Sequence, residues 1–411
     1  MAPQIQNLKR LNTFSVVFAL HSSIASRFMT SLQVSLGFSS TQIGLILGLM
    51  RVGASFVSPV VSSYSDRNKV HRCVLILQSA LRMIPLVIMW LLYDRGGLTL
   101  WWFWILNSAI SVLATGTSPM SDSLILAALE DKSHYGKVRL WGALGYGLGN
   151  MFIGICIAIY GTFDPMFEIS LISVFAALPA AYFFLPPYSS EVQSRCSITA
   201  SSIYGIITQS ASMKVFFVNA VVVGAALSLV ESLLFVTLER TMHGSSPIIA
   251  GASVLISVLC ELPIFRIAPS LIDRYGTKTM LIVANVAWMI RGIGYATFSS
   301  AWVVLLLELL HGVTFGLFFS ASVHTCAKHS PSGMESTMQS LLDMTFNGIG
   351  VALGSIAGGI LFDRVGNANT FFIFCISLAF STGGILLLLK PDEAAADLPI
   401  TQELASTNGA Q

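Results

Sequence analysis

Long apolar stretches follow one another along almost the whole chain, and short polar segments separate them. A helix that crosses the hydrocarbon core of a bilayer needs about 20 predominantly apolar residues. Each stretch is long enough to form such a helix, and each polar segment marks a place where the chain reverses. The pattern predicts twelve membrane-spanning helices, near residues 11–35, 42–63, 73–93, 98–128, 137–160, 167–186, 213–238, 247–271, 279–298, 301–325, 336–361 and 369–390.

One polar segment is longer than the others before the C-terminal tail, and it divides the chain in two. It opens with Pro186 and Pro187 and is rich in serine. We therefore expect an all-α membrane protein with 12 transmembrane helices in two pseudo-symmetric six-helix bundles. The predicted divisions are an N-terminal bundle at 1–186, a cytoplasmic central loop at 187–212, a C-terminal bundle at 213–390 and a disordered cytoplasmic tail at 391–411.

The composition points to the same class. Of the 411 residues, 54% are hydrophobic and 10% are charged, whereas a soluble domain carries about 25% charged residues. The net charge of +2 is spread over the polar segments, which indicates orientation in a membrane and not nucleic-acid binding. The chain is therefore expected to be an integral, multi-pass membrane protein in contact with the lipid bilayer.

Basic residues in the polar segments predict how the helices are oriented. Cytoplasmic loops of membrane proteins carry an excess of Lys and Arg. If both termini are cytoplasmic, the outer loops keep only Arg95, Arg240 and Arg364. The inner side then collects Lys9, Arg10, Arg67, Lys69, Arg72, Lys132, Lys137, Arg139, Arg195, Lys214, Arg274, Lys278, Lys328 and Lys390. We predict cytoplasmic N- and C-termini, and the choice between plasma membrane and organelle stays open.

Motifs of catalysis and of cofactor binding are missing from the sequence. It contains no HExxH, no GxSxG and no phosphate-binding loop. The glycines at 348–354 stand inside an apolar stretch without a preceding strand, which is a packing pattern and not a dinucleotide fingerprint. The six cysteines have no paired spacing, so neither disulfides nor a metal site is expected. An enzyme is not expected, and no cofactor is implied.

Glycines recur at helical spacing in two of the predicted spans. Gly145 and Gly149 are four residues apart in one half, and Gly350, Gly354 and Gly358 repeat the spacing in the other. Such spacing lets helices approach closely in lipid. We expect tight helix packing at both stripes, and sliding surfaces if the two halves move against each other.

Ten ionisable side chains lie within the predicted spans. A charge at the centre of a membrane helix costs about 2.5 to 3.5 kcal/mol on insertion scales, so such residues normally face a partner or a water-filled cavity. The first half is rich in arginine and the second half in acids, and such charges indicate a path through the membrane. The ten residues are Arg27, Arg51, Arg82, Asp122, Glu231, Glu261, Arg266, Arg291, Glu308 and Asp343.

Several of these charges suggest partners. Glu308 and His311 are three residues apart and share a helical face, so they are expected either to exchange protons near neutral pH or to form a static hydrogen bond. Glu261 and Arg291 lie on consecutive predicted helices and are expected to form a salt bridge. That bridge is either a switch, in which protonation of Glu261 frees Arg291, or a fixed brace between helices.

Other charges have less definite roles. Arg27 and Arg82 are expected to meet an anionic group of a solute or acids of the other half. His21, near the middle of the first span, either lines a cavity or is a packing histidine with satisfied hydrogen bonds. Arg266 is expected to snorkel toward the inner surface. Arg82, Glu231 and Arg266 receive no assigned role.

Two short motifs resemble the loop motif of the major facilitator superfamily. Asp66-Arg67-Asn68-Lys69 follows the second predicted span, and residues 273–278, DRYGTK, follow the eighth. The second copy fits well, while the first has Asn68 in the region where the family has glycine. The resemblance implies two parallel halves with a site between them and interdomain or gating roles for Asp66, Arg67, Asp273 and Arg274. It also places Arg51 next to Asp343 across the interface, as a gating pair.

A narrower resemblance, carried by residues 119–146, points to the lactose-permease branch of proton symporters and its phenylpropionate-permease-like and nucleoside-symporter-like relatives. Pro-x-x-Asp122 is followed by Gly-Lys-x-Arg139, with an aromatic ring at Tyr146 seven residues later. In that branch the matched acid and arginine hold sugar hydroxyls, and the ring stacks on the sugar. The resemblance implies that Asp122, Arg139 and Tyr146 contact the solute, although Asp122 with Arg139 could instead be a plain ion pair.

The second half carries the same resemblance. Glu261, Arg291 and His311 match the embedded acid, arginine and histidine of the branch. The branch has a proton-carrying carboxylate three residues after the histidine, whereas this chain has Thr314 there and Glu308 three residues before it. The resemblance implies proton handling by Glu261, Arg291, Glu308 and His311, with a carrier that differs from the branch pattern.

These observations lead to one expected function and two alternatives. We expect a secondary active transporter that moves a small polar solute by alternating access, most simply as a monomeric proton symporter. Sugar is favoured, while nucleosides and aromatic acids stay open. His21 and Arg27 complete the expected solute contacts. The alternatives are a uniporter or organic-anion exchanger and, from another class, a membrane sensor or receptor that does not transport.

Overall fold

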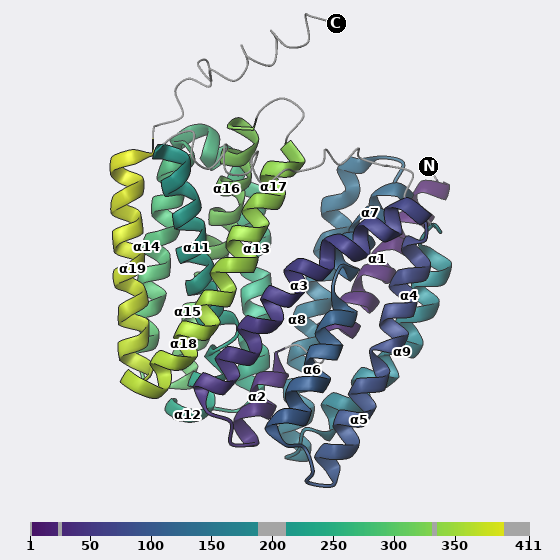
Figure 1. Cartoon of the computed structure of the whole chain (residues 1–411). Coiled ribbons are helices and arrows are strands. Elements are labelled where there is room, and N and C mark those ends of the chain that lie inside the picture. The colour runs from purple at the N-terminus through teal and green to yellow at the C-terminus, as the bar shows by residue number, and fades with distance from the viewer. Residues whose placement is uncertain (1, 24–26, 188–210, 331–334, 390–411) are drawn as a thin grey trace, which may run out of the picture.

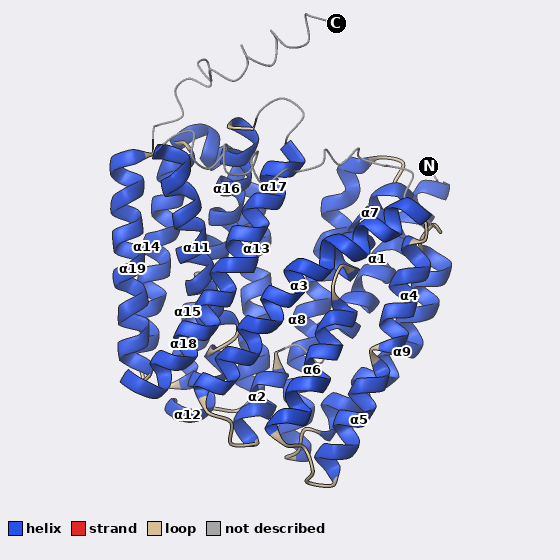
Figure 2. Ribbon diagram, viewed as in Figure 1, coloured by secondary structure: helices blue, strands red, loops and turns tan. Residues whose placement is uncertain are grey.

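The structure is a computed structural model of the whole chain, and it describes residues 2–23, 27–187, 211–330 and 335–389. The described residues form helices, with no strand among them (Figure 2). Nearly all of the predicted central loop and tail, at 188–210 and 390–411, lies outside the described residues. The predicted all-α fold class is confirmed.

Helices of the first half account for its predicted spans. They are α1 (Ala2–Ser23), α2 (Phe28–Ser35), α3 (Ser40–Asn68), α4 (His71–Leu81), α5 (Met83–Asp94), α6 (Leu100–Ala114), α7 (Thr117–Ala128), the short 3₁₀-helix η1 (Lys132–His134), α8 (Tyr135–Tyr160) and α9 (Asp164–Phe184).

Helices of the second half follow the same plan, with two π-helical segments in addition. They are α11 (Ala211–Glu231), α12 (Leu234–Thr241), α13 (Pro247–Tyr275), α14 (Thr277–Thr297), α15 (Ala301–Glu308), the π-helix η2 (Gly312–Leu317), α16 (Phe318–Lys328), α17 (Glu335–Asp343), the π-helix η3 (Met344–Gly350), α18 (Val351–Val365) and α19 (Asn367–Leu388).

Among the described residues, ten helical stretches are long and apolar enough to cross a membrane. The predicted twelve spans need two more, at 11–35 and 98–128, and the structure divides each of these into two helices. In the second case, Gly116 adopts a φ of +81° between α6 and α7, which a residue with a side chain rarely adopts. The count of twelve therefore stays a prediction.

Side-chain caps fix where the long helices begin. Ser39 accepts a hydrogen bond from the backbone of Gln42, and the Gln42 side chain accepts one from the backbone of Ser39, so that α3 starts with a capping box. Ser246 caps α13, with Pro247 at its first turn. These caps therefore define the first turns of α3 and α13.

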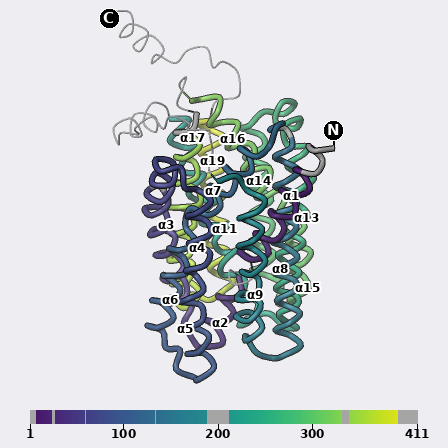
Figure 3. Tube along the Cα trace, turned by 90° about the vertical axis from the view of Figure 1, so that its right-hand side faces the viewer, coloured from purple at the N-terminus to yellow at the C-terminus, as the bar shows by residue number. Residues whose placement is uncertain are grey.

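The helices gather in two groups, one from each half of the chain, and they run along a common direction (Figures 1 and 3). We call the end where α1 begins and α19 ends the terminal face, at the top of Figure 1, and the opposite end the far face. Toward the terminal face the groups diverge. Toward the far face they meet, through α3 against α18 and α8 against α13.

Glycines allow the close approach of the two groups near the far face. A Cβ atom added to Gly44 in α3 would lie 2.2 Å from the backbone oxygen of Ser355 in α18. One added to Gly154 in α8 would lie 2.3 Å from the backbone oxygen of Pro247 at the start of α13. Neither position has room for a side chain, so these crossings depend on glycine.

The glycines of the two predicted stripes pack helices of the same half against each other, unlike Gly44 and Gly154. A Cβ added to Gly145 would lie 2.6 Å from the backbone oxygen of Val16, and one added to Gly354 would lie 2.4 Å from the backbone oxygen of Ala225. Both contacts join helices of the same half. The predicted tight packing is confirmed, and it lies within each half at these two positions.

A polar clamp closes the rim of the far face. The carboxylate of Asp363 at the end of α18 accepts hydrogen bonds from the backbone N–H groups of Ser40, at 3.1 Å, and Thr41, at 2.7 Å. Arg240 donates to the Ser40 hydroxyl at 2.7 Å and to the backbone oxygen of Phe38. The first N–H groups of a helix have no partner within the helix and favour a negative charge, so Asp363 ties the start of α3 to the second half.

Large apolar side chains cover the outer surface of both groups. Phe175, Phe380 and Leu387 are 78%, 79% and 85% exposed. Trp101 and Trp102 are exposed at the start of α6, where tryptophans typically anchor a helix at the membrane interface. Such a surface fits lipid and not water, so the predicted integral, multi-pass membrane protein is confirmed.

Candidate functional site: a central cavity with embedded charges

A cavity of about 1340 Å³ lies between the two groups of helices and is lined by both. Its lining reaches Lys137 at the start of α8 and Val323 in α16, both toward the terminal face. At the other end it reaches Arg27, Glu231 and Phe235, where the groups meet. The cavity therefore faces the terminal face and ends above the far-face contacts.

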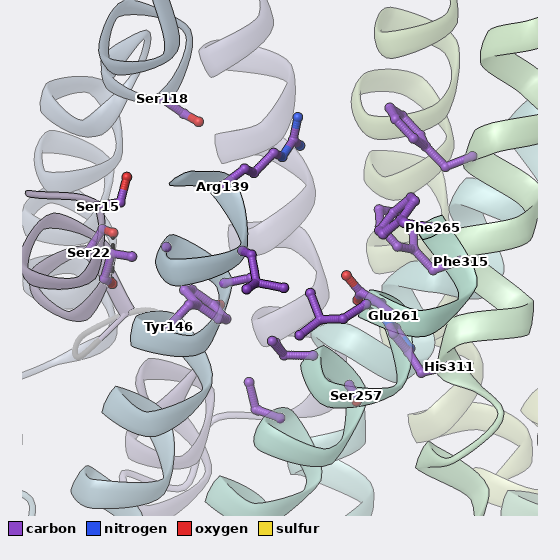
Figure 4. Close-up of a pocket in the computed structure, with 18 of the residues that line it drawn as sticks. Ser15, Ser22, Ser118, Arg139, Tyr146, Ser257, Glu261, Phe265, His311 and Phe315 are labelled. Carbon is purple, nitrogen blue, oxygen red and sulfur yellow. Dashed lines mark hydrogen bonds and ion pairs between the residues drawn. The ribbon is translucent and has the colours of Figure 1, made fainter. Parts of the chain in front are cut away.

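The two walls of the cavity differ in chemistry. Figure 4 shows Ser15, Ser22 and Ser118 of the first half on one side, with Arg139 and Tyr146 nearer the middle. The opposite wall, from the second half, carries Glu261, Phe265, His311 and Phe315. A solute between these walls would meet hydroxyl groups on one side and aromatic rings on the other.

The aromatic wall is an ordered stack. The ring of Phe315 lies parallel to those of His311 and Phe319, with centroids 5.7 Å apart in both cases. Phe265 meets Phe315 edge-on at 6.3 Å. Rings at such distances attract one another, and the contacts hold the wall in a fixed orientation.

Arg291 is the centre of a buried network in the second half, and it is 0% exposed. Its guanidinium lies 2.8 Å from a carboxylate oxygen of Glu308 and donates to the Tyr295 hydroxyl at 3.1 Å. Tyr295 donates in turn to Glu308 at 2.7 Å, and Ser257 donates to the same carboxylate at 2.5 Å. Both charges are thereby held by several hydrogen bonds, as a buried pair requires.

The predicted salt bridge between Glu261 and Arg291 is wrong in this conformation. Arg291 pairs with Glu308 instead, while Glu261 lies 3.0 Å from Nε2 of His311. The reason is the place of each acid. Both acids border the cavity, but the Glu308 side chain is only 3% exposed and lies beside Arg291, whereas the Glu261 side chain is 18% exposed.

His311 connects both acids, Glu261 and Glu308, with Arg291 in one continuous series of contacts. Arg291 donates to Nδ1 of His311 at 3.0 Å, and the Glu308 carboxylate lies 3.8 Å from the same nitrogen. Because arginine only donates, Nδ1 is the acceptor and the imidazole proton is on Nε2, toward Glu261. The predicted proximity of Glu308 and His311 is confirmed.

Thr314 stands where the resembling branch has a carboxylate, and its hydroxyl accepts a hydrogen bond from Arg291 at 2.9 Å. The negative partner of Arg291 is thus Glu308, one turn before His311. Its neutral acceptor is Thr314, one turn after His311. The sequence alone identified this exchange of positions but not its geometry.

Asp122 and Arg139 face the same part of the cavity and interact electrostatically. The hydroxyl of Tyr135 hydrogen-bonds with both of them. Sequence reasoning missed Tyr135, although it precedes Arg139 by four residues on α8 and therefore lies on the same helical face. Their role in solute binding stays a prediction.

Arg27 and Glu231 form an ion pair between the two halves. A guanidinium nitrogen lies 3.0 Å from a Glu231 carboxylate oxygen, and another donates to the backbone oxygen of the same residue. Nε of Arg27 donates to the Tyr146 hydroxyl at 3.2 Å. Of the two partners predicted for Arg27, the structure shows the acid of the other half.

His21 does not line the cavity, contrary to its predicted solute contact. It is 1% exposed, with Nδ1 2.7 Å from the Ser173 hydroxyl and Nε2 2.9 Å from a guanidinium nitrogen of Arg82. Arg82 has to find an acceptor inside its own half, and the imidazole supplies one. His21 is the packing histidine of the alternative interpretation.

The predicted pair of Arg51 and Asp343 is not formed. Asp343 accepts a hydrogen bond from Asn347 at 2.7 Å, and no ion pair joins it to Arg51, although both residues are described. The Arg51 charge acts on Glu231 instead. Arg51 and Asp343 are not level with each other, because α3 packs with Gly48 against Ala352 and with Ser55 against Gly348.

The remaining predicted residues lie outside the centre or at its edge. Asp66 lies 2.8 Å from Nε2 of His71, and Arg274 lies over the ring of Tyr275. No contact tests the gating roles predicted for these motifs, including Arg67 and Asp273. Arg266 is exposed and lines the cavity.

Two groups of membrane helices around a charged cavity define the class of a membrane transporter. The sequence matches the MFS_1 like family over residues 10–374. This chain therefore belongs to that family, within the major facilitator superfamily. The predicted superfamily is confirmed.

Characterised and uncharacterised relatives support the same assignment. The maltose permease of Geobacillus stearothermophilus is 24% identical over 388 residues, which are 93% of this chain and 95% of that protein. The uncharacterized transporter YwbF of Bacillus subtilis is 25% identical over 358 residues, 86% of each chain. Because the relatives are permeases and transporters, the prediction that the chain is not an enzyme is also confirmed.

A solved structure shares the fold. The crystal structure of a single-residue mutant of the nucleoside transporter NupG superimposes with a TM-score of 0.78 at 16% identity. The match covers 93% of this chain and 100% of that one. At this identity the likeness establishes the arrangement of helices and not the solute.

Proposed function

We propose that this transporter moves a small hydroxylated solute by alternating access and that a proton gradient drives the movement. The observation that carries the proposal is the chain of contacts from Glu261 through His311 and Arg291 to Glu308. It begins at the partly exposed Glu261 and ends at the buried ion pair of Arg291 and Glu308. Protons and solute would thus enter the same cavity.

Protonation of His311 would change the hydrogen bonds in this series of contacts. A proton taken up at His311 turns Nδ1 into a donor, which can no longer accept from Arg291. The imidazolium would then be held by the carboxylates of Glu261 and Glu308, 3.0 and 3.8 Å away. An imidazole suits this role because each of its two ring nitrogens can donate or accept a hydrogen bond.

The first-half wall supports the proposed solute contacts. Asp122 offers acceptors and Arg139 offers a forked set of donors, which together can hold neighbouring hydroxyl groups. Tyr135 links the two side chains, and Ser118 lies on the same side of the cavity. The ring of Tyr146 lines the space between them and the second half.

The aromatic wall favours a second candidate solute class besides simple sugars. A flat ring could stack against Phe315 or meet Phe265, across the cavity from the hydroxyl-rich wall. Nucleosides and aryl glycosides combine a flat ring with hydroxyl groups. One relative is named for maltose and one structural neighbour for nucleosides, so both classes are candidates for this chain.

Basic residues support a cytoplasmic terminal face. In that orientation the cavity faces inward in this conformation, and the far-face contacts close it to the outside. Alternating access requires these contacts to separate while the terminal-face ends of the helices approach. We propose that one chain suffices, because both walls of the cavity come from the same chain.

Uptake into proteoliposomes tests the proposal. The solute is first chosen by its effect on the melting temperature of purified protein, with maltose, uridine and phenyl glucoside as probes. We expect an inward proton gradient to drive accumulation of the stabilising solute. Glu261→Gln should abolish accumulation while counterflow without a gradient continues, because binding is kept and coupling is lost.

Glu168→Gln is the matched control, since Glu168 is an exposed acid of α9 that does not line the cavity. Uptake that is the same with and without the proton gradient would contradict symport and favour the uniporter. Counterflow of organic anions without pH dependence would favour the exchanger. Stabilisation by a solute that never accumulates would favour the sensor or receptor.

A further inference from the structure

Arg27 and Glu231 are the one pair, among the ten embedded charges, that joins the two halves of the molecule. Arg82 bonds with His21 inside the first half, and Arg291 bonds with Glu308 inside the second. All ten embedded charges are described by the structure. An ion pair that crosses the interface can exist only while the halves are close together.

The pair lies where two helices are interrupted. Glu231 is the last residue of α11, and Arg27 directly precedes α2. Arg27 also donates to the backbone oxygen of Glu231, one of the carbonyl groups that lack a partner at a helix end. The arginine therefore binds both the charge and the helix terminus of the other half.

The far-face contacts begin directly beyond this pair. Phe28 follows Arg27 and meets Phe235 of α12 edge-on, with ring centroids 5.3 Å apart. On the other side, Arg27 and Glu231 line the cavity, with side chains 17% and 25% exposed. The pair thus lies at the closed end of the cavity, at the point where the far-face contacts begin.

We propose that the Arg27–Glu231 pair is an interdomain latch that keeps the far side of the cavity closed. The proposal rests on the proposed alternating access of this transporter. In the state open to the far face, Arg27 and Glu231 separate with their respective halves. The strength of the latch then sets the balance between the two states.

Each charge keeps a polar neighbour when the latch opens. Arg27 bonds with Tyr146 of its own half. Glu231 has His311 as an ionisable neighbour in its own half, while the Arg27 and Arg51 charges act on it from the first half. A buried charge without any partner would be costly, and this arrangement avoids that cost in the open state.

Tyr146 connects the latch to the solute. Its hydroxyl accepts from Arg27, and its ring lines the cavity wall on which a solute is expected to lie. A solute that replaces Arg27 as the hydrogen-bond partner of this hydroxyl removes one of the contacts that position Arg27. The latch therefore lies within reach of the bound solute.

Distances across the far face test the latch. Spin labels are placed at Asp94→Cys and Ser299→Cys, exposed positions of the two halves, after replacement of the six native cysteines by serine. Double electron–electron resonance is recorded in nanodiscs without any solute or gradient. Glu231→Gln should increase the ratio of long to short distances about two- to fivefold, the range for a partly exposed ion pair.

A double-mutant cycle separates a latch from general loosening. Arg27→Gln should give the same increase, and Arg27→Gln with Glu231→Gln should give no more than either single change, because they remove one interaction. Arg82→Gln is the matched control, an embedded arginine whose pair lies within one half, and it should leave the distances unchanged. Tyr146→Phe should give a smaller increase than Glu231→Gln.

Unchanged distances in a monodisperse Glu231→Gln protein would overturn the proposal. So would additive effects in the cycle, or an equal increase in Arg82→Gln. The measurement needs neither transport nor a proton. A failed uptake experiment with shifted distances would contradict the proposed function alone, and normal uptake with unshifted distances would contradict the latch alone.

Discussion

At the scale of single residues, His311 decides how the charges of the second half are arranged. Its two nitrogens face different partners, Arg291 on one side and Glu261 on the other. One proton added at Nδ1 therefore ends the hydrogen bond from Arg291, while Nε2 stays a donor to Glu261 and becomes part of a positively charged ring. The fully buried Arg291 makes this arrangement costly to disturb, because each of its hydrogen bonds would leave a buried polar group unpaired.

Removal of the Glu308 charge should therefore destabilise the protein strongly. Breaking a buried ion pair by removing one partner costs about 3 to 5 kcal/mol, and Glu308 with Arg291 is such a pair. We expect Glu308→Gln to lower the melting temperature of the purified protein clearly, while Glu168→Gln leaves it within error. Equal melting temperatures for the two variants would show that Arg291 does not depend on Glu308.

The sequence predicts which charged residues matter better than it predicts their pairing. Hydropathy places Glu261, Arg291 and Glu308 inside spans, and their helical order is correct. The rotation of each helix about its axis cannot be read from hydropathy, so the sequence favours Glu261 as the partner of Arg291 although Glu308 is nearer. For the same reason, the contact of Arg27 with Glu231 across the two halves cannot be predicted from hydropathy.

At the scale of helices, close crossings and interruptions determine the shape. The crossings of α3 with α18 and of α8 with α13 depend on glycine, whereas η2 and η3 interrupt two helices of the second half next to the charged centre. π-Helical segments are rare and frequently occur at functional sites. η2 begins directly after His311, which fits that tendency.

Gly44→Ala tests the dependence of the far-face contact on glycine. The added Cβ would lie 2.2 Å from the Ser355 backbone oxygen, so α3 and α18 must move apart. We expect longer distances between labels at positions 94 and 299. Gly53→Ala on the same helix is the control, because its Cβ meets nothing within 4 Å and alanine favours a helix by about 0.5 to 1 kcal/mol. The same distances in both variants would contradict a glycine-dependent closure.

The positions of the helices are largely predictable from apolar length, because each span must cross the same thickness of lipid. The interruptions of the helices are not predictable from apolar length. Gly116 and the end of α11 at Glu231 interrupt apolar stretches that read as continuous. Hydropathy records how much lipid a segment can cross, and it does not record where its backbone hydrogen bonds change partner.

At the scale of the whole molecule, the cavity is open toward one face and closed toward the other. The closure has three layers: the Arg27–Glu231 pair, the glycine crossings and the clamp of Asp363 and Arg240. Toward the opposite face the described helices of the two groups diverge. This asymmetry is what an alternating transporter requires of one of its two states.

Movement of protons with the solute tests the central claim most directly. Proteoliposomes filled with a pH-sensitive dye receive the stabilising solute outside, with no imposed pH gradient and with the membrane potential clamped. Symport predicts that the lumen acidifies as the solute enters, and that Glu261→Gln abolishes this acidification but not binding. Solute entry at a constant lumenal pH would contradict proton coupling through the cavity wall.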